Sequence, residues 1–204
     1  MNKVRNAALA LAGAAALTLP SIGMAQSMSG PDSGWLVGGS VGQSKIKVDC
    51  SGLSCDDTDT AFRIFGGYNF NKHFGVELGY ADLGKVTFTG VVPPLGTVNG
   101  DIKAKAFDLM AVGTLPIGDK FGVYGKLGMY RADSDFHATS SVAGTASTSD
   151  TNTDITYAIG AQYNFNKNLG IRAEWQQYKK VGGDNTGGDG DVDVMSIGVV
   201  WLFK

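Results

Sequence analysis

The sequence predicts an all-β fold: an eight-stranded antiparallel up-and-down transmembrane β-barrel with short periplasmic turns and long outer loops. Eight runs of residues alternate between apolar side chains and small or polar ones, which is the period-two pattern of β-strands. Short and long connections alternate between these runs, as they do in bacterial outer-membrane barrels. One side of the runs is rich in aromatic residues and the other carries small residues with a few isolated charges, so the aromatic side is expected to face lipid.

The clearest pair of runs lies between Thr60 and Tyr80. Apolar residues hold one parity on both sides of the polar turn at 71–72, and Arg63 and Glu77 hold the other parity. The segment YNFNKHFG around this turn returns almost unchanged as YNFNKNLG at residues 163–170. A repeated hairpin favours the repetitive closure of one sheet.

The other runs follow in order. The first alternates Trp and Val with Gly, which suits a crowded interior. In the fourth and fifth runs, which flank the turn at Pro116, every second residue is mostly apolar. In the last run the large apolar residues also occupy every second position, up to Phe203. The expected strands are residues 35–44, 60–70, 74–80, 103–115, 121–132, 155–165, 169–179 and 192–203.

Four long loops are expected between these strands, at residues 45–59, 83–101, 133–154 and 180–191. Within the second, residues 86–92 are a candidate for extending the strands beyond the membrane. The third is a Ser/Thr/Asp/Ala tract that cannot pack a core, so a mobile loop is expected there. The five prolines all lie outside the alternating runs, as strands that donate every N–H require.

The N-terminus has the form of a signal peptide, residues 1–25. Lys3 and Arg5 precede an apolar run over 7–19, and small residues lead to an expected cleavage after Ala25. The alternative is a retained anchor, but this run is too short to span roughly 30 Å of hydrocarbon. Residues 26–33 are then a short periplasmic leader and residues 34–204 the barrel.

Cys50 and Cys55 lie in a polar stretch without the spacing of a redox motif or nearby histidines for zinc. In an oxidising compartment we expect a disulfide between them, and two free thiols are the alternative.

The composition gives no reason to expect nucleic acid binding, because the seventeen Lys and Arg residues are balanced by nineteen Asp and Glu residues. There is no metal-ligand spacing and no phosphate-binding glycine motif, so no cofactor, no metal and no enzyme activity are expected. His137 near Thr139 and Ser140 is a candidate fragment of a Ser–His pair, but hydroxyl groups are everywhere in that tract.

A soluble eight-stranded barrel such as a lipocalin is the main structural alternative. It would place its large apolar residues inside and many charged residues outside. Here the strand positions that alternate with the large apolar residues carry only isolated charges among Gly, Ala and Ser, which favours the membrane barrel.

The repeated YNFNK turns, the segment KAFDLMAVGTLPI and the aromatic final strand resemble the outer-membrane β-barrel family of the OmpA transmembrane-domain type. The resemblance covers Trp35 to Phe203 and implies contact with outer-membrane lipid and lipopolysaccharide, assembly by the barrel-assembly machinery, and a monomer. The sequence departs from the family in stopping at Lys204 without the periplasmic peptidoglycan-binding domain. Lys204 also follows the terminal aromatic residue that the assembly machinery recognises.

Six charges are expected to point into the barrel, three of each sign: Arg63, Glu77, Asp108, Lys126, Arg172 and Glu174. Glu77 and Arg172 lie at similar depth, so they are expected to pair across the lumen. If Leu115 pairs with Phe121, Asp108 and Lys126 are diagonal neighbours and are expected to form a second pair. An eight-stranded barrel leaves little free bore. In the resembling family such a network blocks the lumen and has been treated as a gate.

These features together predict an outer-membrane protein with an envelope-structural role, either closed by the acid–base network or acting as a narrow pore. The alternatives are a surface adhesin or host-interaction protein that acts through its outer loops, and a conduit for small hydrophobic compounds. The inward residues Phe65, Met110 and Leu202 give the conduit slight support.

Overall fold

The computed structural model describes residues 33–47, 54–56, 58–92, 96–140, 142, 144–183 and 188–203. Within these ranges the chain forms nine strands: β1 (Gly34–Lys47), β2 (Ser54–Asp56), β3 (Thr58–Asn69), β4 (Phe74–Val92), β5 (Gly96–Ile117), β6 (Phe121–Ser140), β7 (Gly144–Asn164), β8 (Leu169–Gly183) and β9 (Gly188–Leu202). Within them there is no helix long and apolar enough to cross a membrane.

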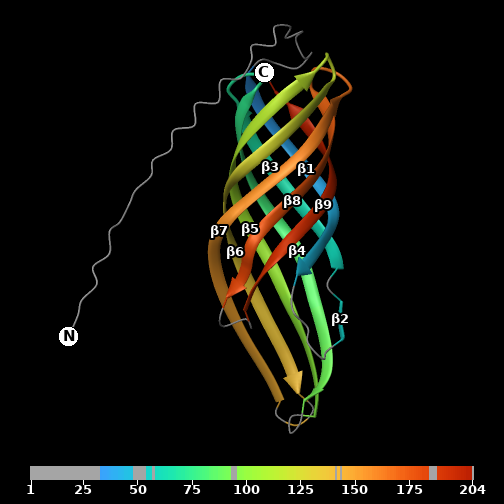
Figure 1. Cartoon of the computed structure of the whole chain (residues 1–204), viewed down its shortest axis with the longest axis vertical. Coiled ribbons are helices and arrows are strands. Elements are labelled where there is room, and N and C mark those ends of the chain that lie inside the picture. Colours follow the sequence, from blue (N-terminus) through green and yellow to red (C-terminus); the bar gives the residue numbers. More distant parts are fainter. Residues whose placement is uncertain are drawn as a thin grey trace, which may run out of the picture.

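Eight of these strands close into a single antiparallel ring. The hydrogen-bonded order is β4-β3-β1-β9-β8-β7-β6-β5, and β5 pairs again with β4 to complete the circle (Figure 1). The first and last strands meet along a long ladder that begins with Leu36 opposite Leu202. The short strand β2 stands outside the ring and pairs with the far part of β4. The predicted eight-stranded barrel is confirmed.

Inward and outward residues alternate along the strands as the parity predicts. On β3, Phe62 and Ile64 are 59% and 66% exposed on the outside, whereas Arg63 and Phe65 are buried inside. The outer surface is apolar and aromatic at most positions of the membrane-spanning part, which a lipid-facing surface requires.

The short turns at residues 70–73 and 165–168 share one geometry, as the repeated sequence predicts. The Asn71 side-chain oxygen accepts hydrogen bonds from the backbone N–H groups of His73 and Phe74, at 2.8 and 2.9 Å. The Asn166 side-chain oxygen accepts hydrogen bonds from the equivalent backbone N–H groups of Asn168 and Leu169, at 2.9 and 2.8 Å. An asparagine that bonds its own following backbone stabilises a tight turn. These turns mark the periplasmic end.

The predicted long loops are wrong over most of their length, because the strands continue. β4 and β5 stay paired up to Val92 opposite Gly96, which bears out the extension expected for residues 86–92. β6 and β7 stay paired up to Ser140 opposite Gly144, so the predicted mobile loop at 133–154 is mostly a hairpin. These two hairpins extend beyond the other strands at the lower end of Figure 1. A ladder that continues an existing sheet needs no core of its own, and threonine favours strands.

The fourth predicted loop, 180–191, is also largely strand. β8 and β9 pair as far as Gly183 opposite Gly188, with an irregularity between Tyr178 and Val181. Lys180 lies in this irregularity with a φ of 53°. A non-glycine residue in that region is uncommon, and here it accompanies a bulge.

Several sequence predictions lie outside the described residues. They include the signal peptide at 1–25, nearly all of the leader at 26–33, and Cys50. The backbone of Cys55 lies in β2, opposite Phe88. The disulfide therefore stays a prediction.

Two apolar clusters fill the barrel interior at different depths. The cluster nearer the outer side comprises Ala61, Ala81, Leu83, Ala104, Ala106, Tyr130, Ala132, Tyr178, Val181, Val192 and Val194. The cluster nearer the periplasmic turns comprises Leu36, Phe65, Val200 and Leu202. On β3 the inward positions run in sequence through Ala61, Arg63 and Phe65, so the charged layer lies between the two apolar ones.

Candidate functional site in the barrel interior

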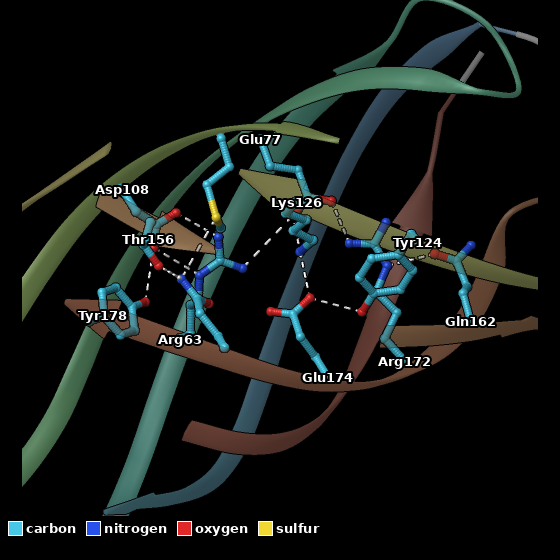
Figure 2. A network of polar contacts seen from close by, with 12 residues as sticks. Arg63, Glu77, Asp108, Tyr124, Lys126, Thr156, Gln162, Arg172, Glu174 and Tyr178 are labelled. Carbon is cyan, nitrogen blue, oxygen red and sulfur yellow. Dashed lines mark hydrogen bonds and ion pairs between the residues drawn. The ribbon is translucent and has the colours of Figure 1, made fainter. Parts of the chain in front are cut away.

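The six charges predicted to point inward all do so, from five different strands. Arg63 comes from β3, Glu77 from β4, Asp108 from β5, Lys126 from β6, and Arg172 and Glu174 from β8. Each has a side chain that is at most 9% exposed. They form one continuous layer of polar contacts across the lumen (Figure 2).

One part of this layer is built around Asp108. The Arg63 guanidinium donates from Nε and Nη2 to the two oxygens of Asp108, at 3.1 and 2.7 Å. The Tyr178 hydroxyl donates a third hydrogen bond to the same carboxylate, at 3.1 Å. A two-point guanidinium–carboxylate contact is strong and fixes the geometry of both groups.

The other part is built around Glu77. Its carboxylate contacts Arg172 Nη1 at 2.5 Å and Lys126 Nζ at 2.6 Å, and Arg63 Nη1 lies 3.9 Å away. Lys126 Nζ is also 2.6 Å from Glu174. Glu77 thus links the two parts of the layer, because it contacts cations from both.

Polar side chains that the sequence did not single out complete the layer. The Tyr124 hydroxyl donates to Glu174 at 2.8 Å. Arg172 Nε donates to Gln162 Oε1 at 2.6 Å, and the Gln162 amide donates onward to Asn164 at 2.7 Å. All of these residues share the inward parity of their strands, so parity is the signal that would have found them.

Aromatic rings cover the cations. The Phe65 ring centroid lies 5.0 Å from the Arg63 guanidinium carbon, 5.2 Å from that of Arg172 and 5.5 Å from Lys126 Nζ. The Tyr124 ring lies at similar distances from Lys126 and Arg172. Cations over aromatic faces are attracted by the ring quadrupole, so these rings stabilise charge while excluding water.

The structure brings together one of the two pairs that the sequence predicts. Glu77 and Arg172 are in contact, whereas Lys126 contacts the two glutamates rather than Asp108. That second prediction assumed that Leu115 pairs with Phe121, but Leu115 pairs two residues further along β6. Lys126 therefore faces Val112, about 13 Å along β5 from Asp108.

The arrangement offers little chemistry beyond charge neutralisation. The described residues contain no cluster of His, Cys, Asp or Glu that could hold a metal ion. His137 is exposed on β6, opposite Asp101 on one side and Ser147 on the other. No hydrogen bond joins these three side chains in the part of the chain that the structure describes.

Comparison with known proteins gives a consistent result. The profile of the outer membrane protein β-barrel domain matches residues 7–203. Outer membrane protein A of Salmonella typhi is 35% identical over 144 residues, which are 68% of this chain and 39% of that protein. Outer membrane protein A of Yersinia pseudotuberculosis is 31% identical over 182 residues, which are 84% of this chain and 49% of that protein. The chain spans at most about half the length of these curated relatives.

Solved structures share the fold. Neisserial surface protein A is 16% identical with a TM-score of 0.57, and the match covers 83% of this chain and 97% of that one. Ail, the attachment invasion locus protein of Yersinia pestis, is 24% identical with a TM-score of 0.55, over 83% of this chain and 99% of that one. At these identities the likeness shows the barrel architecture alone.

Proposed function

The chain belongs to the outer membrane protein β-barrel family and resides in the outer membrane, and we propose that it serves there as an envelope-structural barrel with a closed interior. The observation that carries this proposal is the charged layer around Glu77, which lies between two apolar layers. A hydrated ion that entered from either side would meet buried apolar side chains before it reached a charge.

The tightness of the charged layer supports the closure. The cavity beside Arg63 and Tyr178 has a volume of about 10 Å³, which is about the room that one water molecule needs. Glu77 and Asp108 are 1% and 0% exposed. Opening a path would separate buried ion pairs, and breaking such a pair costs about 3–5 kcal/mol.

The test is the conductance of the refolded chain in planar lipid bilayers. The parent protein is expected to give traces like those of bare lipid. Arg172→Gln, which removes one cation from Glu77, is expected to stay closed as well, because the apolar layers on both sides of the network remain. Openings in this variant would instead show that the charge network acts as a gate. Arg131→Gln is the matched control, because Arg131 is exposed on β6. Steady channel steps from the parent protein would overturn the closed barrel and favour a narrow pore.

A second function, surface adhesion, is favoured by the outer extension of β4, β5, β6 and β7. These strands form a continuous sheet beyond the end of the β7–β8 ladder at Thr156 and Tyr178. Ail of Yersinia pestis, which shares the fold, has been crystallised in complex with the heparin analogue sucrose octasulfate. Here we propose contact with host or surface ligands through this extension rather than through the interior.

Adhesion is tested by shortening the β6–β7 hairpin and measuring the adherence of cells that display the protein. Replacing residues 137–147 by a two-residue turn removes the tip and leaves the ladder nearer the membrane. A loss of adherence with unchanged surface amounts supports the role, and unchanged adherence refutes it. We propose no catalytic role, and the hydrophobic conduit has no comparable observation in its favour.

A further inference from the structure

The lipid-facing wall of the barrel carries two open hollows that adjoin one another. The larger has a volume of about 1340 Å³ and the smaller about 680 Å³. Ala161 on β7 and Ala173 on β8 line both of them. These alanines hold the same parity as Ile159 and Ile171, which are exposed on the outer surface. The hollows therefore open toward the surrounding membrane and not into the lumen.

Small residues form the floor of the larger hollow. Gly113 on β5 lies opposite Gly125 on β6, and the two alanines lie opposite each other on β7 and β8. Their neighbours on the same face are large, since Leu115 and Ile159 are each 62% exposed. The hollow thus arises where side chains that would cover the backbone are missing from an otherwise bulky wall.

The packing of the barrel itself does not require these two glycines. A Cβ added at Gly113 would lie 4.0 Å from the Gly125 carbonyl oxygen, and one added at Gly125 would lie 3.9 Å from the Ala158 carbonyl oxygen, both ordinary contacts. At the inward-facing Gly128 a Cβ would instead lie 2.0 Å from the Leu109 carbonyl oxygen. Neither Gly113 nor Gly125 has a positive φ. Glycine weakens a strand, so a role on the outer surface accounts for it better than a role inside.

The depth of the hollows selects hydrocarbon as their content. The chain resides in the outer membrane, and a bilayer core has no water to fill a groove in an apolar wall. A row of paired residues runs along the larger hollow from Gly113 on β5 to Trp175 on β8. It crosses three strand spacings, or roughly 14 Å. Gly113 lies opposite Phe74, the first residue of β4, so an acyl chain that enters from the periplasmic leaflet can follow this row.

The charges at the periplasmic end select the headgroup. Lys72 directly precedes His73, which lines the larger hollow, and Lys120 directly precedes Phe121, which lines the smaller. None of the ion pairs within the described ranges involves either lysine. Asp119 is the one acidic residue of the three short turns, against three lysines. Lysine keeps its ammonium group at headgroup level while its stem lies along apolar surface, so these turns favour a negatively charged lipid.

We propose that the two hollows hold the acyl chains of an anionic phospholipid of the periplasmic leaflet, whose headgroup lies at the turns that carry Lys72 and Lys120. The hollows provide the contact area, because chains that fill them regain the dispersion contacts that a void forfeits. The lysines provide the preference for negative charge. This binding does not depend on closure of the interior, so the two proposals fail or succeed separately.

The test uses the fluorescence of Trp175, which lines the larger hollow. The sequence contains two other tryptophans, so Trp35→Phe/Trp201→Phe leaves Trp175 alone. The full chain with these two changes is refolded into phosphatidylcholine vesicles that contain increasing fractions of phosphatidylglycerol brominated near the ends of its acyl chains. Bromine quenches tryptophan on contact. The brominated phosphatidylglycerol is expected to bind at least about fivefold more tightly than brominated phosphatidylcholine, the effect of one lysine near an anionic lipid.

Two sets of variants in this background separate the hollow from the charges. Gly113→Leu/Gly125→Leu fills the hollow and is expected to abolish the preference. Gly66→Leu is the matched control, because Gly66 is an outward glycine of β3 that lines neither hollow and has room for a Cβ. Lys72→Gln/Lys120→Gln is expected to reduce the preference to within about twofold while quenching by brominated phosphatidylcholine stays unchanged. Circular dichroism of each refolded variant checks that the barrel has formed.

Three results would overturn the proposal. Equal quenching by the two brominated lipids in the parent background would mean ordinary contact with the surrounding bilayer only. A preference that survives Gly113→Leu/Gly125→Leu would mean that charge attracts the lipid without any site in the wall. A preference that lipopolysaccharide removes and the lysine changes leave intact would make a lipid of the outer leaflet the occupant.

Discussion

Glu77 is the most sensitive point of the interior. Glu77→Gln keeps the size and part of the hydrogen bonding but removes the charge that Arg172, Lys126 and Arg63 share. At an effective dielectric constant of about 20, contacts of 2.5 and 2.6 Å each correspond to about 6 kcal/mol of attraction, and 3.9 Å to about 4 kcal/mol. Most of this is offset by desolvation of the buried charges.

Glu77→Gln is therefore expected to lower the free energy of unfolding by about 3–5 kcal/mol, the cost of removing one partner of a buried ion pair. The assay is urea unfolding of the protein refolded into lipid vesicles, followed by tryptophan fluorescence, with the free energy extrapolated to zero urea. Asp135→Asn, exposed on the outer part of β6, is the control and is expected to stay within about 0.5 kcal/mol of the parent. A Glu77→Gln variant as stable as the control would refute the argument that this network holds the interior together.

Other predictions concern single positions. Gly79→Val is expected to cost about 1–3 kcal/mol in the same assay, because a Cβ there would lie 2.5 Å from the Arg63 guanidinium. Asn71→Ala is expected to cost about 1 kcal/mol by removing two turn hydrogen bonds, with a similar loss for the equivalent asparagine of the repeat; a loss in one turn only would show that the repeat is not equivalent. Asp59, at the outer end of β3 beyond the membrane, accepts backbone hydrogen bonds from Thr60 and Lys85 that lower its pKa below the ordinary 3.8. The stabilisation is thus present at neutral pH and lost as the pH falls through the lowered pKa. A drop in the protection factor of the Lys85 amide in acid, relative to the intrinsic exchange rate at each pH and absent in Asp59→Asn, would reveal this loss.

The parity of the sequence predicts most of the fold because it depends only on which side chains face lipid. A residue such as Ile64 has to lie outside and Arg63 inside, whatever the register of the strands. The contact between Glu77 and Arg172 was predictable for a related reason, because both lie five residues from the lysine of a repeated turn.

Register and strand length were not predictable in the same way. A change of two residues in the β5–β6 pairing preserves every inward and outward position, yet it places Lys126 opposite Val112 instead of Met110 and so two residues further from Asp108. The hairpin at residues 133–154 escaped prediction because its composition is that of a solvated loop. Its pairing is imposed by the barrel strands from which it continues rather than by its own side chains.

The pairing of β1 with β9 has a consequence for assembly. The ladder that begins with Leu36 opposite Leu202 joins the two ends of the strand order, so the sheet keeps two open edges until the last strand arrives. Open edges in hydrocarbon leave backbone groups without partners at a cost of several kcal/mol each. Insertion and closure should therefore occur together in one late and highly nonlocal step, which makes a slow folding reaction the expected behaviour of this chain.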